Sequence, residues 1–127
     1  MKRDMELVRL LLLEMEKVPI GEDLDLTKIE GYESDDIHYH IMLLHQAGLI
    51  QALDGSGGGG HFDWIPEYIT WEGHEFLETI RDDKKWERLM TTVGKETGGV
   101  AFELIKSTAI AWAKQKLGQI GLPTDFS

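Results

Sequence analysis

The stretch that decides the fold is Ser34-Asp-Asp-Ile-His-Tyr-His-Ile-Met-Leu-Leu-His-Gln-Ala-Gly-Leu-Ile50. Its apolar positions Ile37, Ile41 and Leu44 follow the i, i+4, i+7 spacing of one helical face. Gly48 supplies a C-terminal stop, and the two apolar residues after it can begin a strand. The stretch therefore predicts a helix that ends at a glycine and continues directly into a strand.

Helix-start signals precede this apolar face. Ser34 is the expected N-cap, and Asp35 and Asp36 fall in the first turn, where the helix dipole favours negative charge. The same face includes His40, which we expect to be buried, with Asp36 one turn back as its partner.

A hairpin is predicted to follow the helix. Residues 49–53 form the first strand, and the glycine-rich segment 54–60 forms the tip. Residues 62–69 form the returning arm, with Pro66 at an edge or a bulge because proline lacks a backbone donor. A helix, a strand, a glycine-rich tip and a second strand are typical of a winged helix-turn-helix. The predicted fold class is mainly α with a small β-hairpin (α+β), with an added C-terminal helix.

The other elements complete a domain of ordinary size. We predict a first helix over residues 3–17, a weak strand over 22–27, a single turn over 27–32 and a helix from Trp71 with Thr70 as N-cap. The spacing of Trp86 and Leu89 would extend this last helix. An apolar, alanine-rich helix over 100–117 closes the chain. The expected domains are 1–90 for the winged helix, 91–99 for a linker, 100–118 for the association helix and 119–127 for a tail.

Charge is distributed unevenly along the chain. The net charge is −10, and no Lys or Arg occurs between Lys28 and Arg81, where ten Asp and Glu residues lie. Lys and Arg supply most of the affinity of a protein for DNA phosphates. The predicted recognition helix and wing therefore carry none of the charge that usually binds DNA.

Composition narrows the function classes. The chain has no cysteine, which excludes disulfides and thiolate chemistry and fits a cytoplasmic protein. No signal peptide and no apolar run long enough to span a membrane are expected. No catalytic constellation is evident, so we expect neither an enzyme nor a cofactor.

All five histidines fall between positions 38 and 74. A metal site is one interpretation, because His38 and His45 are seven residues apart on one helical face. No His-Glu-x-x-His or similar ligand spacing occurs, however. We therefore favour structural or solvated histidines and expect no bound metal.

Several motifs resemble a known group of sequences. The opening Met1-Lys-Arg-Asp-Met5, the segment 30–50 and Thr70-Trp-Glu-Gly-His-Glu-Phe-Leu77 are similar to a family of small uncharacterised phage, prophage and bacterial proteins. The resemblance implies a winged-helix-like domain and a phage-linked origin. It implies no activity.

Two functions remain open. In the first, the protein is a DNA-binding transcriptional regulator. Lys2, Arg3 and Arg9 are then predicted to contact phosphates. His38, His45 and Gln46 face outward from the helix and are predicted to contact bases, and Tyr39, also outward, is a further predicted nucleic-acid contact. In the second, it is an acidic interaction module that keeps the winged-helix shape and binds a basic protein. In either case we expect a homodimer through the last helix. Its predicted interface residues are Phe102, Ile105, Ala109 and Trp112.

Overall fold

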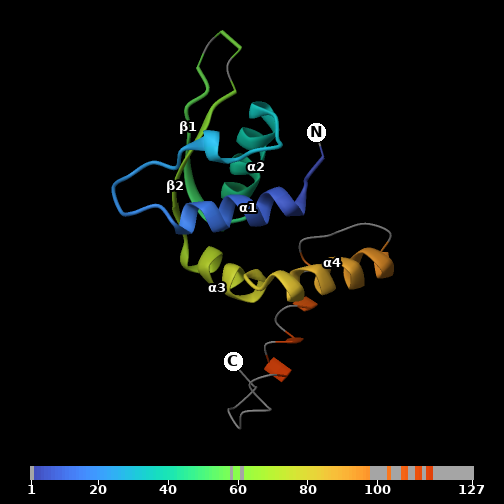
Figure 1. Cartoon of the computed structure of the whole chain (residues 1–127). Helices are drawn as coiled ribbons and strands as arrows, with labels where there is room; N and C mark the ends of the chain where they lie inside the picture. Colours follow the sequence, from blue (N-terminus) through green and yellow to red (C-terminus); the bar gives the residue numbers. More distant parts are fainter. Residues whose placement is uncertain are drawn as a thin grey trace. The chain divides into compact units, whose positions relative to one another are not determined.

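A computed structural model describes residues 2–57, 59–60 and 62–97, together with residues 103, 107, 108, 111, 112, 114 and 115. The described elements are helices and one two-stranded antiparallel hairpin, which confirms the predicted α+β class (Figure 1). The chain divides into two compact units, Met1–Leu77 and Glu78–Ser127, which are described separately.

Helix α1 (Met5–Glu16) confirms the predicted first helix. Its N-cap is Asp4, whose carboxylate accepts a hydrogen bond from the Glu6 N–H at 2.9 Å. Its buried face includes Leu7, Leu11 and Leu12, all fully covered. Burial of each leucine side chain stabilises the folded state by about 1.5–3 kcal/mol relative to leaving it exposed. This face contacts α2 and β2, and so α1 forms one wall of the core.

The weak strand predicted over residues 22–27 is wrong. The segment after α1 is irregular and then forms the 3₁₀ turn η1 (Leu26–Lys28). The Asp25 carboxylate accepts hydrogen bonds from the Thr27 N–H at 3.0 Å and the Thr27 hydroxyl at 2.6 Å. This local capping competes with extended pairing and starts a turn. The single helical turn predicted over residues 27–32 is present, as the 3₁₀ turn over Leu26–Lys28.

Helix α2 (Ser34–Gln46) is the predicted central helix. The capping residue is Glu33 rather than Ser34, and its side chain makes no capping hydrogen bond. The predicted helix phase is confirmed, because the buried residues of α2 are Ile37, His40, Ile41 and Leu44.

The C-terminus of α2 ends in a Schellman motif. Gly48 has a φ of +76°, the Gly48 N–H donates to the His45 carbonyl at 3.0 Å, and the Leu49 N–H donates to the Leu44 carbonyl at 3.0 Å. Leu49 is buried, so its side chain joins the core as the chain leaves the helix. The predicted glycine stop is thus confirmed, and it directs the chain into β1.

The hairpin consists of β1 (Ile50–Asp54) and β2 (Trp64–Ile69). The pairing register shifts between Gln51 and Ala52, which leaves Glu67 as the extra residue of a bulge in β2. Pro66 pairs with Ala52 beside this bulge, as its missing N–H requires.

Helix α3 (Trp71–Ile80) begins directly after β2. The Thr70 hydroxyl accepts from the Gly73 N–H at 3.1 Å and donates to the Gly48 carbonyl at 2.6 Å. Thr70 is therefore the predicted N-cap, and it also ties α3 to the end of α2. A Cβ atom at Gly73 would overlap the Leu49 carbonyl oxygen, so only glycine fits at this close approach.

Helix α4 (Asp83–Thr97) lies in the second unit. The Asp82 carboxylate accepts from the Lys85 N–H at 2.9 Å at the start of this helix. Trp86 and Leu89 are buried, and the Arg88 guanidinium lies 4.6 Å from the centre of the Trp112 ring. Because α4 continues through Thr97, residues 91–97 are helical where the sequence predicts a linker.

Candidate functional site

Three histidines of α2 each lie within hydrogen-bond distance of a backbone N–H from another segment. His40 is the most deeply buried, with a relative exposure of 1%. The Asp4 N–H donates to His40 Nε2 at 2.7 Å, so Nε2 is an acceptor and carries no proton. The proton therefore lies on Nδ1, which donates to the Asp36 carbonyl at 2.7 Å.

This arrangement makes His40 a link between two helices. The neutral imidazole satisfies the N-cap residue of α1 and a carbonyl of its own helix at once. The prediction of a buried His40 bonded to Asp36 is confirmed, with the backbone carbonyl of Asp36 rather than its carboxylate as the acceptor.

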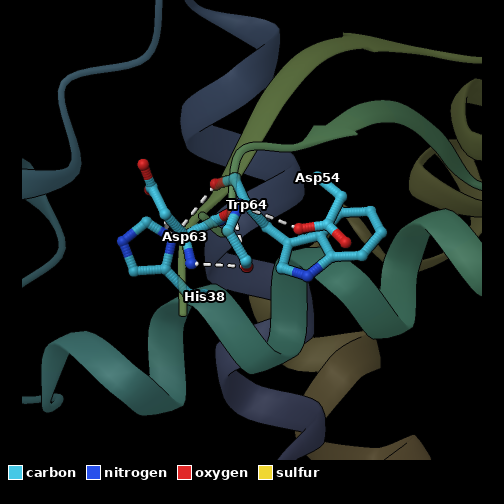
Figure 2. Close-up of polar contacts among 5 residues, drawn as sticks. His38, Asp54, Asp63 and Trp64 are labelled. Atoms are coloured by element: carbon cyan, nitrogen blue, oxygen red, sulfur yellow. Dashed lines mark hydrogen bonds and ion pairs between the residues drawn. The ribbon is translucent and has the colours of Figure 1, made fainter. Parts of the chain in front are cut away.

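Hydrogen bonds to His38 connect the beginning of β2 to α2. The N–H and the carbonyl oxygen of Trp64 both lie 3.0 Å from His38 Nδ1, and a carboxylate oxygen of Asp63 lies 3.4 Å from it. Figure 2 shows these groups turned toward one another. Nδ1 can accept from the Trp64 N–H when the ring is neutral and can donate to oxygen when it is protonated. His38 therefore has a hairpin partner in either protonation state.

His45 holds the other strand. The Ala52 N–H donates to His45 Nδ1 at 3.3 Å, at the position where the bulge disturbs the ladder. The imidazole also lies 5.6 Å from the centre of the Trp64 ring, at an interplanar angle of 41°. Both strands are thus fixed to α2 through imidazole nitrogens.

The expected outward orientation of His38 and His45 is therefore wrong. Both are half-buried because the hairpin folds back along α2 and its backbone takes their Nδ1 atoms. Tyr39 is half-buried too, with its ring 5.8 Å from His40 in an edge-on arrangement. Of the residues predicted to contact bases, only Gln46 is classed as exposed.

The predicted phosphate contacts lie near the start of the chain. Lys2 and Arg3 are exposed before α1, and Arg9 is half-buried on α1. All three residues thus come from a segment other than α2 and the hairpin, which supply His38, His45 and the backbone groups bonded to them.

A hollow of about 500 Å³ lies between the start of α2 and the base of the hairpin. Its lining includes Ser34, Asp35, His38 and Asp63, together with loop glycines. The loop is closed at Asp54, whose carboxylate accepts from the Ser56 N–H at 2.9 Å. Hydrogen bonds from the Ser56 N–H and then its hydroxyl hold the pKa of Asp54 below its ordinary value. The hollow is acidic, and its described lining contains no Lys or Arg.

The predicted dimer interface is only partly described. Phe102, Ile105 and Ala109 lie outside the described residues, whereas Trp112 is helical and half-buried beside Arg88. Within the described part of the chain, no three His, Asp or Glu side chains come close enough to hold a metal ion. None of the helices described is both long and apolar enough to cross a membrane.

Sequence reasoning missed the groups from other segments that bond to the three α2 histidines. All three are backbone groups, of Asp4, Trp64 and Ala52, and a backbone N–H leaves no side-chain signal in a sequence. The one available signal is the placement of histidines on two faces of a helix that precedes a hairpin.

Comparison with known proteins places this helix-and-hairpin domain in a group defined by sequence. The family of hypothetical proteins designated DUF2513 matches residues 2–100. The chain is also 35% identical over 118 residues to an uncharacterized protein of Haemophilus influenzae, which covers 92% of this chain and 99% of that protein. The chain belongs to the DUF2513 family. No solved structure matches it.

Proposed function

We propose that this protein is a winged-helix domain that acts as an acidic protein-interaction module, neither reading DNA nor catalysing a reaction. The order α1, η1, α2 and hairpin supports the winged-helix assignment, because it supplies a helix, a short turn, a second helix and a wing. In that arrangement α2 occupies the place of the recognition helix.

One observation carries the proposal. The two side chains best placed on α2 to contact bases, His38 and His45, are bonded to the backbone of the hairpin. Direct readout needs side chains that present donors and acceptors to base edges in the major groove. To contact bases, these two imidazoles would have to break their hydrogen bonds to the hairpin strands.

The charge of the same region supports this assignment. Residues 29–80 contain α2, the hairpin and α3, and they carry ten acidic residues and no Lys or Arg. Such a surface repels phosphates and attracts a basic protein surface. A module with this charge fits a partner rich in Lys and Arg.

DNA-binding regulation of the phage or prophage type is the second candidate. The helix–turn–helix order of elements favours it, and Lys2, Arg3 and Arg9 are the side chains that would contact phosphates. This function requires α2 to approach the duplex without any positive charge of its own.

A paired binding experiment distinguishes the two functions. Fluorescence anisotropy is measured with a labelled duplex of mixed sequence and with a labelled Lys-rich peptide, at salt from about 50 to about 200 mM. We expect binding to the peptide and none to the duplex. Duplex binding that weakens steeply with salt, by about 10³-fold or more over this range, would instead assign the protein to DNA.

A further inference from the structure

A second hollow, of about 440 Å³, lies between the end of α1, the chain that follows it and β2. We call it the β2 groove, and define it by Ile20, Tyr68 and Ile69 on its apolar side and by Glu16, Glu22 and Glu67 on its acidic side. Its volume falls within the range of about 300–1,000 Å³ that is usual for binding pockets. All of these residues belong to the first unit.

One wall of the β2 groove is a turn that presents an apolar side chain. The Glu22 N–H donates to the Pro19 carbonyl at 3.2 Å, and Gly21 has a φ of +85°. A four-residue turn with glycine at its third position is typical of type II, so Ile20 occupies the corner. Its relative exposure is 104%, as great as in an extended chain. The turn therefore holds an isoleucine in contact with water.

The opposite wall belongs to β2. Tyr68 is 60% exposed, whereas its neighbour Ile69 is buried and also lines the hollow. Glu67, the bulge residue that precedes Tyr68, is exposed and lines the same hollow. An aromatic ring with a polar hydroxyl is a common anchor at protein interfaces because it buries a large area at low entropic cost.

The charge of the lining residues indicates which kind of ligand the β2 groove would bind. Its described lining includes three glutamates and His74, and no Lys or Arg. An apolar floor and walls bordered by carboxylates complement a large apolar side chain with a cationic residue on either side. A nucleic acid would bring phosphates to these glutamates and is disfavoured.

We propose that the β2 groove binds an extended segment of another protein, in which a large apolar residue is flanked by Lys or Arg. The apolar residue lies between Ile20 and Tyr68, and the cationic residues face Glu22 and Glu67. This inference rests on the proposed interaction function and names the surface and the partner chemistry for it.

The test uses the full chain and two labelled peptides. One peptide is Gly-Lys-Lys-Leu-Lys-Lys-Gly, and the other has Glu in place of every Lys. The groove variants are Ile20→Ser and Glu67→Lys. The matched control is Glu30→Lys, which makes the same charge change at an exposed acid outside the groove. Circular dichroism checks that each variant is folded.

We expect only the Lys peptide to bind. Ile20→Ser and Glu67→Lys should weaken its binding by about fivefold or more, and Glu30→Lys by less than about twofold. Equal weakening by Glu67→Lys and Glu30→Lys would show that net charge alone attracts the peptide. The groove assignment would then be wrong, while the acidic interaction function would stand.

Two other outcomes are also decisive. Binding to the duplex of the previous experiment without binding to the Lys peptide would refute both the proposed function and the groove. Self-association of the full chain that Ile20→Ser abolishes in sedimentation velocity would show that a second copy fills the groove, which refutes a foreign partner.

Discussion

Replacing His40 with Asn tests how α1 is joined to α2. The Asn amide ends near the position of Nδ1, so it can still donate to the Asp36 carbonyl but cannot reach the Asp4 N–H. An unsatisfied backbone donor costs about 1–3 kcal/mol, and we expect the free energy of unfolding to fall by this amount. Urea unfolding followed by circular dichroism measures the loss. Hydrogen exchange should show faster exchange of the Asp4 amide.

Two further variants make this result specific. Gln at position 40 places its carbonyl oxygen near Nε2, so His40→Gln keeps the bond from Asp4 and should lose less stability than His40→Asn. His74→Asn changes an exposed histidine on α3 and should alter stability by no more than about 0.5 kcal/mol. The reasoning is refuted if His40→Asn matches His74→Asn, or if Asp4 exchange is unchanged.

Three other predictions concern the glycine at position 73, the pH dependence of stability and the oligomeric state. Gly73→Ala should destabilise the protein by more than about 3 kcal/mol in urea unfolding, because its Cβ would overlap a backbone oxygen. Gly57→Ala should be tolerated, because a Cβ at Gly57 meets open space. Similar urea midpoints for the two variants would contradict this prediction. The pKa of Asp54 is lowered in the folded protein, so its contribution to stability is present above its unfolded pKa of about 3.9 and is lost as pH falls through the folded value. Asp54→Asn should therefore flatten the loss of stability below about pH 4. An unchanged slope of stability against pH would count against the Ser56 turn. Light scattering should find the full chain dimeric through residues 100–117 and a chain ending after residue 97 monomeric; a full chain that stays monomeric well above micromolar concentration would remove the dimer.

The sequence predicted the helix–hairpin order because its signals are local. Ile37, Ile41 and Leu44 define one helical face, and Gly48 lacks the Cβ atom that disfavours the positive φ of the Schellman motif. The glycine-rich tip and Pro66 likewise predicted the hairpin and its irregular pairing. Each of these features depends on residues a few positions apart.

The contacts of the candidate site could not be predicted in the same way. His40 meets Asp4 at a separation of 36 residues, and His38 meets Trp64 at a separation of 26. Helical phase shows which side of α2 each histidine occupies, but it does not show where the hairpin lies. His38 and His45 therefore looked exposed in the sequence, although the hairpin covers them.

The break between α3 and α4 was missed for a related reason. Apolar spacing continues from Ile80 to Trp86 and Leu89, and all three are buried, so the pattern favoured one longer helix. The capping bond from the Lys85 N–H to the Asp82 carboxylate starts a new helix instead. The strand predicted over 22–27 was lost to the same kind of local capping, by Asp25.

Nuclear magnetic resonance of the histidine ring nitrogens tests the central claim most directly. The full chain, labelled with ¹⁵N-histidine, is titrated with a mixed-sequence duplex at about 50 mM salt, where phosphate contacts are strongest. If His38 and His45 remain bonded to the hairpin backbone, their ring signals should not shift or broaden as duplex is added. Selective shifts of these two rings, reversed at about 200 mM salt, would show that α2 reads DNA and would contradict the account.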